Sequence, residues 1–200
     1  MKTKILEMLR QSETGAFISG QELCGQLGVS RTAVWKSIRQ LKEAGYQIEA
    51  VQNKGYRLLS VPDILSKSEI ESRLHTQWAG RPICYFDEID STNTEAKRVA
   101  EGAAGAQGHG TVIVAEEQNA GRGRRGRDWS SPRGEGIFFS ILLRPDMNPA
   151  NASMLTLVKA LAVAKGISKS TGLEPAIKWP NDVVINGRKI VGILTEMSAQ

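Results

Sequence analysis

Short apolar stripes at helical spacing run through the first 45 residues of the chain. They predict three helices, over residues 4–10, 19–28 and 30–44. The second begins with a capping box, because Ser19 is followed three residues later by Glu22. Two helices joined by a short turn that contains glycine form a helix-turn-helix. The pattern therefore predicts a small helical module at the N-terminus.

Two β-prone runs, residues 48–51 and 56–59, follow these helices and flank Asn53-Lys54-Gly55. They predict a hairpin wing, so residues 1–62 are interpreted as a winged helix-turn-helix domain. In such a domain the first residues of the last helix meet base edges, and basic residues beyond them hold phosphates. We expect Trp35 to pack in the core or against the wing. The expected DNA contacts are Arg31, which would read a guanine, and Thr32, Lys36, Arg39 and Lys54.

The remainder of the chain, residues 63–200, begins after the linker Val61-Pro62-Asp63 and mixes helices with strands. Helices are predicted over residues 66–74, 92–100 and 153–170, and strands over residues 83–86, 111–116, 137–143 and 176–179. Asn186-Gly187 then joins two β-branched runs, residues 183–185 and 189–194, which predicts an antiparallel hairpin. The pattern indicates an α+β fold with a mixed or antiparallel sheet and helices mostly on one face.

Charge and composition limit the functional classes. Residues 1–62 hold nine Lys/Arg and five Asp/Glu, a net charge of +4, whereas residues 63–200 hold 17 and 16, a net charge of +1. This asymmetry favours a polyanionic partner for the N-terminal module. No apolar run approaches about 18 residues and no signal-peptide cleavage site follows the first helix, so we expect a cytoplasmic protein without a membrane partner.

Side chains that could hold a metal are scattered. Cys24 and Cys84 are single and far apart, and His75 and His109 have no acidic or cysteine cluster beside them. We therefore expect the two cysteines to be small buried residues, neither in a disulfide nor zinc ligands, and no metal site built by the protein itself.

The segment from Gly121 to Arg127 reads GRGRRGR, three glycines among four arginines. Glycine lets the backbone turn tightly, and guanidinium groups match carboxylate and phosphate oxygens, so the segment predicts an anion site. It fits the dinucleotide pattern G-x-G-x-x-G, but the next residues, 128–134, read as loop instead of the required helix. No Walker A sequence occurs. The alternative is an exposed arginine tract that contacts nucleic acid nonspecifically or is simply solvated.

Four segments in this order resemble biotin protein ligases, and the N-terminal module resembles that of the bifunctional members that also repress the biotin operon. The segments are DEIDSTN (87–93), AEEQNAGRGRRGRDW (115–129), KWPND (178–182) and GRKIVGIL (187–194). The resemblance implies a catalytic domain like that of class II aminoacyl-tRNA synthetases. It also implies that the sequence lacks later parts of this domain and a small C-terminal β-barrel, so we expect it to be truncated.

The resemblance also implies site residues. Without it, Ser91, Thr92 and Asn93 would be read as helix capping, and Lys189 as a lysine on the solvent face of a strand. With it, the implied biotin contacts are Ser91, Thr92, Asn93, Gln118, Arg122, Gly123, Arg124 and Lys189. The implied nucleotide contacts are Arg124, Trp129 and Asn181, and the implied catalytic groups are Arg122, Arg124, Lys189 and Asp182. Asp182 is assigned either to magnesium or to the acceptor amine.

The implied reaction has two steps. The carboxylate of biotin attacks the α-phosphate of ATP, with Mg²⁺, to form biotinyl-5′-adenylate, and a lysine of a biotin carboxyl carrier protein then attacks the acyl carbon. Operator DNA and a ligand-promoted homodimer are the other implied partners. The alternative from another class is a transcription regulator that senses biotin or its adenylate without catalysis.

Overall fold

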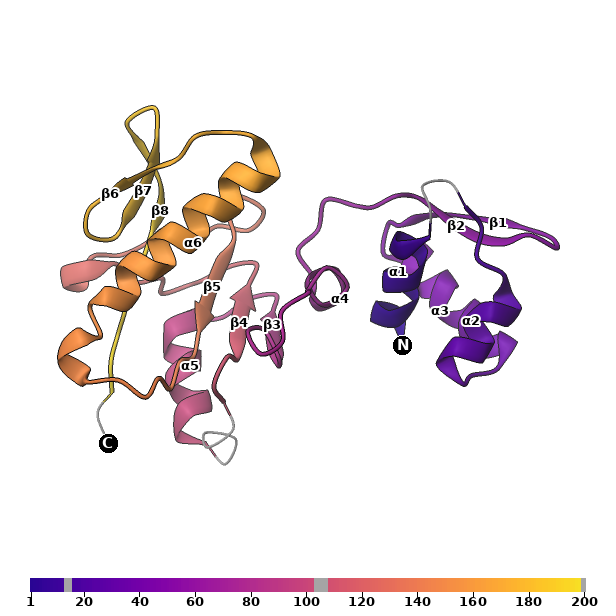
Figure 1. The fold of residues 1–200 in the computed structure, drawn as a ribbon, viewed down its shortest axis with the longest axis horizontal. Helices are drawn as coiled ribbons and strands as arrows, with labels where there is room; N and C mark the ends of the chain where they lie inside the picture. The colour runs from indigo at the N-terminus through magenta and orange to yellow at the C-terminus, as the bar shows by residue number, and fades with distance from the viewer. Residues whose placement is uncertain (13–15, 103–107, 199–200) are drawn as a thin grey trace. The chain divides into compact units, whose positions relative to one another are not determined.

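The computed structural model describes residues 1–12, 16–102 and 108–198 (Figure 1). The chain divides into two compact units, Met1–Tyr85 and Phe86–Gln200, and each is considered by itself.

Three helices and a two-stranded sheet form the first part of the N-terminal unit. They are α1 (Lys2–Gln11), α2 (Gly20–Leu27), α3 (Arg31–Glu43), β1 (Gln47–Val51) and β2 (Gly55–Ser60). The Ser19 hydroxyl accepts from the Glu22 N–H at 3.0 Å, and the Ser30 hydroxyl accepts from the Ala33 N–H at 3.3 Å. Polar N-caps of this kind satisfy N–H groups that have no partner within the helix. The predicted helices and the wing are confirmed.

The wing is attached to the segment that precedes α2 through backbone hydrogen bonds. The Ile18 N–H donates to the Tyr56 carbonyl at 2.9 Å, and the Tyr56 N–H donates back at 2.8 Å. Gly55 permits this approach, because its φ is +112° and an added Cβ would lie 2.0 Å from the Ile18 carbonyl oxygen. Beneath the wing, the apolar faces of the three helices form one core with Leu6, Leu23 and Leu41 fully buried.

A short helix, α4 (Lys67–Glu71), packs against α1 within the same unit. Its central residue Glu69 is only 7% exposed. The Glu69 carboxylate accepts from the Tyr46 hydroxyl at 2.6 Å, from Arg10 at 2.6 Å and from Arg73 at 3.2 Å. Helix α4 is shorter than the helix predicted over residues 66–74. Residues 63–85 group with the N-terminal unit, whereas the sequence suggested a boundary at 62.

Two α-helices and six strands follow among the described residues, and they confirm the α+β class. They are β3 (Ile83–Phe86), α5 (Thr92–Glu101), β4 (Val112–Ala115), β5 (Phe138–Ile141), α6 (Met154–Thr171), β6 (Ala176–Lys178), β7 (Asp182–Ile185) and β8 (Arg188–Gly192). The strands form two three-stranded sheets, in the orders β3-β4-β5 and β6-β7-β8. The pairs β4-β5, β6-β7 and β7-β8 are antiparallel, and a parallel bridge joins Ile89 to Gln118.

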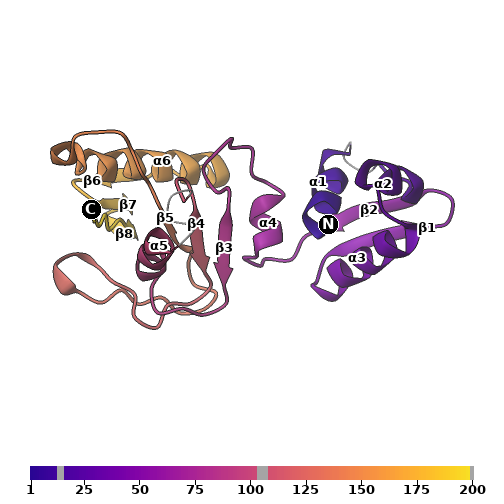
Figure 2. The same cartoon turned by 90° about the horizontal axis from the view of Figure 1, so that it is seen from below.

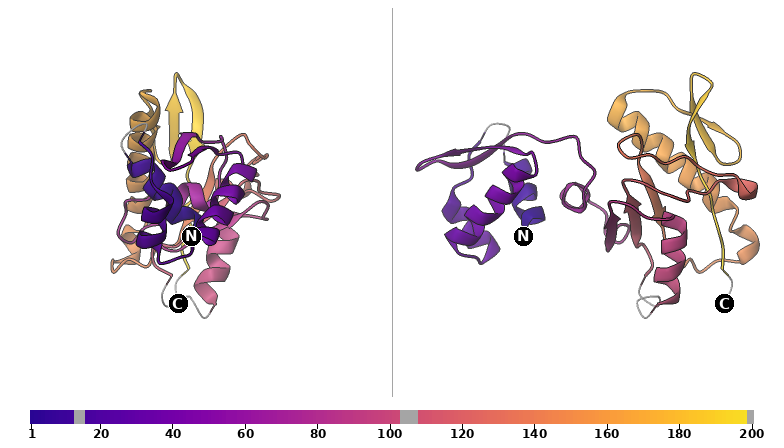
Figure 3. Two further views of the ribbon diagram at one scale, coloured as in Figure 1. Left: turned by 90° about the vertical axis from the view of Figure 1, so that its right-hand side faces the viewer. Right: turned by 180° about the vertical axis from the view of Figure 1, so that it is seen from behind.

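One helix covers each of these sheets. Helix α5 packs against β4 and β5, as Figure 2 shows, and α6 packs against β6 and β7. Ala160 and Ala164 of α6 are buried against Val183 of β7. The β7–β8 hairpin, yellow in Figure 3, turns at Asn186 and Gly187, whose φ values of 50° and 74° suit a type I′ turn. Across the described residues, no helix is long and apolar enough to cross a membrane.

Candidate functional site

One open pocket of about 1500 Å³ in the second unit is lined by nearly all of the residues that the sequence analysis assigned to biotin, nucleotide or catalysis. The expected residues that line it are Ser91, Thr92, Asn93, Gln118, Arg122, Gly123, Arg124, Trp129, Asn181 and Lys189. They come from four separate segments of the chain, so their convergence is a property of the fold. Asp182 does not line this pocket but lies beside it through its contact with Lys189.

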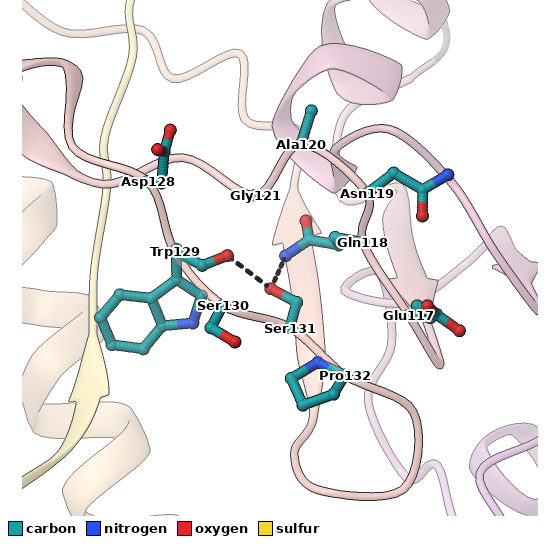
Figure 4. Close-up of a pocket in the computed structure, with 10 residues that line it drawn as sticks. All are labelled: Glu117, Gln118, Asn119, Ala120, Gly121, Asp128, Trp129, Ser130, Ser131 and Pro132. Carbon is teal, nitrogen blue, oxygen red and sulfur yellow. Dashed lines mark hydrogen bonds between the residues drawn. The ribbon is translucent and has the colours of Figure 1, made fainter.

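A polar cluster surrounds the first turn of α5. The backbone N–H and the hydroxyl of Thr92 both donate to Gln118 Oε1, at 2.9 and 3.1 Å. Gln118 Nε2 in turn donates to the Ser131 hydroxyl at 2.8 Å, and Figure 4 shows these two side chains pointing toward each other. The hydroxyl of Ser140 on β5 lies 2.9 Å from the Thr92 hydroxyl and also within hydrogen-bond distance of Asn93 Oδ1, so its single proton is shared between the two. The cluster therefore fixes the expected ring-contacting residues relative to one another.

The helix-capping interpretation of Ser91, Thr92 and Asn93 is wrong. Ser91 occupies the N-cap position of α5 and is buried, but its hydroxyl makes no capping hydrogen bond. Thr92 is the first residue of the helix itself, so its side chain does not occupy the N-cap position. Gln118 takes the role of the missing cap for the Thr92 N–H, which leaves the Ser91 hydroxyl available beside the pocket.

Glu196 also lines the pocket, and the sequence reasoning did not include it. Its carboxylate accepts from Asn93 Nδ2 at 2.9 Å and from Lys97 at 2.8 Å. The hydrogen bond from Lys97 lowers the pKa of Glu196, and Asn93 and the charge of Arg122 act in the same direction against partial burial. Asn93 and Glu196 are 103 residues apart, so no local pattern signals the pair.

Lys159 of α6 was also missed. It lines the same pocket, and burial lowers its pKa. A lysine within an otherwise apolar helix could have indicated this position from the sequence. A helix that packs on a sheet often carries such a residue at its edge, however, so the pattern alone does not indicate a role in a site.

The GRGRRGR segment closes on itself as a hairpin-like loop. A bridge pairs Arg122 with Asp128, the Gly123 N–H donates to the Arg127 carbonyl at 2.7 Å, and a 3₁₀ turn spans Arg124–Gly126. At its base the Trp129 N–H donates to the Gly121 carbonyl at 2.9 Å. All four arginines are exposed. No helix follows the loop, which agrees with rejecting the dinucleotide fingerprint.

Arg124 reaches across the pocket to KWPND, where its guanidinium donates to Asn181 Oδ1 at 2.9 Å. Asn181 is held by Ile193, since the Ile193 N–H donates to its carbonyl at 2.9 Å and its amide donates to the Ile193 carbonyl at 3.3 Å. The contact joins the arginine loop to the second sheet. Asn181 is therefore at least structural in this arrangement.

Lys189 lies within the site and does not simply face solvent. Its ammonium lies 2.8 Å from Asp182 Oδ1 and 5.0 Å from the centre of the Trp129 ring. Gly192 makes room for this packing, because an added Cβ would lie 2.9 Å from Trp129 and 3.1 Å from Lys189. Lys189 is thus held by a carboxylate and an aromatic face, and it lines the pocket.

The part of the chain that the structure describes contains no group of three or more His, Cys, Asp or Glu side chains that could hold a metal ion. Asp182 is the one expected carboxylate at this site, and Lys189 already pairs with its Oδ1. The residues therefore fit a divalent cation only as a partner of phosphate groups, which Mg²⁺ commonly is.

The expected DNA contacts gather on the N-terminal unit. Arg31, Thr32, Lys36 and Arg39 are exposed on α3, and Lys54 is exposed at the turn of the wing. The ring of Phe17 lies close to two cations of the wing, with its centre 4.7 Å from the Arg57 guanidinium and 6.0 Å from the Lys54 ammonium. Trp35 contradicts the expectation of core or wing packing, because it is 53% exposed. Its neighbour Val34 takes the core position instead.

Two family models match the chain. The model of the biotin/lipoate A/B protein ligase family covers residues 85–200, and the model of an HTH domain covers residues 2–57. The first match covers nearly the same residues as the second unit, whereas the second match covers only the first 57 residues of the N-terminal unit.

Relatives match the whole length of the chain. The bifunctional ligase/repressor BirA of Bacillus subtilis (strain 168) is 46% identical over all of this chain and 60% of that protein. BirA of Escherichia coli (strain K12) is 35% identical over 98% of this chain and 58% of that protein. The biotin protein ligase from Aquifex aeolicus in complex with biotin and ATP is 37% identical, with a TM-score of 0.51 over 59% of this chain and 47% of that one. The chain thus spans about 60% of the length of the BirA relatives.

Proposed function

Because the chain belongs to the biotin/lipoate A/B protein ligase family, we propose that it contributes the adenylate-forming site of a biotin protein ligase that also represses transcription. The main support for this proposal is that four separate sequence segments meet at one pocket, which combines a polar cluster with several cations. Similarity to a ligase with biotin and ATP bound supports the choice of substrates.

The two ends of the pocket suit the two ends of biotin. A ureido ring both donates and accepts hydrogen bonds, and Ser91, Thr92, Asn93 and Gln118 supply donors and acceptors held in fixed positions. The carboxylate of biotin would then face Arg122, Arg124 and Lys189. Gly123 leaves the loop backbone free to approach the ligand, and Trp129 would cover the nucleotide beside Asn181.

The reaction brings two anions together, so the protein must position them and stabilise the charge that develops on the α-phosphate. No protein nucleophile is required, because the biotin carboxylate attacks phosphorus directly and pyrophosphate leaves. Lys189 is the cation best placed for this charge, and Arg122 and Arg124 assist it. Mg²⁺ would enter with the phosphates of ATP. We assign Asp182 to orienting Lys189, and after adenylation to holding the incoming lysine amine of the carrier protein.

The N-terminal unit is proposed to bind operator DNA. Arg31 and Thr32 would meet bases, whereas Lys36, Arg39 and Lys54 would hold phosphates. A ligand-promoted homodimer would let two such units contact two half-sites. A sensor that binds biotin or its adenylate without catalysis would keep the same pocket, so only a measurement of chemistry separates it from a ligase.

That measurement is incubation of the protein with biotin, α-labelled ATP and Mg²⁺, followed by separation of labelled products. Formation of biotinyl-5′-adenylate with release of pyrophosphate is expected. Tight binding of added biotinyl-adenylate without its formation would favour the sensor, and binding of neither ligand would reject both functions.

Replacement of Lys189 by alanine is expected to lower the single-turnover rate of adenylate formation by about ten- to a hundredfold, because one charge-assisted contact to the reacting phosphate is lost. Biotin binding should change less. Lys189→Met keeps the apolar stem against Trp129 and should be equally slow, which separates charge from packing. Lys165→Ala, an exposed lysine on α6, is the matched control. Normal kinetics in both Lys189 variants would show that this lysine has no role in adenylate formation.

A further inference from the structure

Trp35 is a large apolar side chain that the N-terminal unit leaves in solvent. It is 53% exposed, although it lies next to Val34, which is almost fully buried. The core of this unit takes Val34, Ile38 and Leu41 from α3 and does not include Trp35. Packing of the unit therefore does not account for a tryptophan at this position.

The position of Trp35 on α3 places it among basic residues. Arg31, Trp35 and Arg39 follow one another at intervals of four, so they share one side of the helix. Lys36 is adjacent and also exposed. The Arg39 guanidinium lies 5.2 Å from the centre of the Trp35 ring, and Arg39 also pairs with Glu43 at 3.3 Å. The ring is thus in contact with one cation, Arg39, and lies on a helix face that also carries Arg31.

The charge of this surface determines which partner it fits. The centres of protein–protein interfaces are depleted of charged residues, whereas DNA interfaces are strongly basic. An exposed aromatic ring on a helix that also exposes Arg31, Lys36 and Arg39 matches the second kind. In addition, Trp35 is the fifth residue of α3, in the half of a recognition helix that enters the major groove.

We propose that Trp35 contacts the base edges of the operator and reads a thymine through its C5-methyl group. This inference rests on the proposed DNA-binding function and adds a specificity-determining residue to it. The thymine methyl is the apolar group that a base pair presents in the major groove, so an exposed indole finds its match there. The contact with Arg39 would orient a phosphate-binding guanidinium at the edge of the same ring.

The test uses the full chain and a duplex selected by it from a random-sequence pool. Each thymine of the selected site is replaced in turn by uracil, which removes only the methyl group. For the wild-type protein we expect at least one position where uracil weakens binding about fourfold, the effect of burying one methyl group. Trp35→Ala should bind thymine and uracil equally at that position, while Trp35→Phe should retain part of the preference.

Leu59→Ala provides the matched control, because Leu59 is a similarly exposed apolar residue of the same unit, at 56%, on β2. It should keep the thymine preference. If Trp35→Ala keeps every thymine preference of the wild type, or none exists, the inference is overturned while DNA binding stands. If the wild-type chain enriches no duplex from the pool even at low salt, the proposed DNA-binding function itself fails.

Discussion

Replacement of Gly121 by alanine is expected to reduce adenylate formation by about a hundredfold or more. An alanine Cβ would lie 2.3 Å from the Trp129 carbonyl oxygen, 2.8 Å from the Ser131 hydroxyl and 3.3 Å from Gln118 Nε2. The first two contacts are too short for any Cβ, so the backbone at the base of the arginine loop must move. Displacement of reacting groups by about 1 Å is sufficient for a loss of this size.

The result is measured as the single-turnover rate of adenylate formation at saturating biotin and ATP. Gly126→Asn is the matched control within the same loop, because a Cβ there meets nothing within 4 Å and asparagine tolerates the positive φ of 71°. It should retain most of the activity. Equal rates for Gly121→Ala and wild type would show that the loop base does not position the reacting groups.

Replacement of Glu69 by alanine is expected to lower the free energy of unfolding of the N-terminal unit by about 3–5 kcal/mol. The change leaves the Arg10 guanidinium and the Tyr46 hydroxyl without their carboxylate partner in a buried position. Removal of one member of a buried ion pair has costs of this size. Denaturant unfolding followed by circular dichroism measures it. Glu49→Ala, which breaks the more exposed pair with Arg57, should cost less than about 1 kcal/mol.

The same cluster predicts a pH dependence with a defined sign. Burial opposes ionisation of Glu69, but hydrogen bonds from Tyr46 and Arg10 prevail and lower its pKa. Its contribution to stability is therefore present at neutral pH and is lost as the pH falls through the lowered pKa. Burial, together with the hydrogen bond to Glu69, raises the pKa of Tyr46 to about 12, so its contribution is lost as the pH rises above about 10. A Glu69→Ala variant that loses the same stability as wild type on acidification would contradict this assignment.

Local sequence signals predicted the elements well and the residues of the site in large part. The caps at Ser19 and Ser30 and the turn at Asn186-Gly187 act over a few residues, so spacing alone reveals them. The resemblance to biotin protein ligases supplied site residues that the fold brings to one pocket.

The expectations that differ from the structure depend on contacts between distant segments. Glu69 meets Arg10 across 59 residues, and this contact attaches α4 to the helical module and groups residues 63–85 with it. Gln118 takes the capping role at Thr92 across 26 residues, so the first turn of α5 needs no cap from Ser91. Pattern and composition do not encode such pairings. Trp35 is a different case, because the helix period is a local signal and already assigns the core positions to its neighbours.

The unequal cores of the two units have a consequence for thermal unfolding. The N-terminal unit buries ten apolar side chains in one cluster. In the second unit, the described residues bury a smaller cluster of Ala160, Ala164 and Val183 and, outside it, Ala96, Ile113, Val114 and Ala115, so four of the seven are alanines. Buried apolar area contributes much of the stability of a folded unit, so we expect the two units to unfold at different temperatures. Calorimetry should then resolve two transitions, and no single Tm would describe the chain. A bound adenylate should raise only the transition of the second unit, and the melting curve would then report which unit holds the ligand.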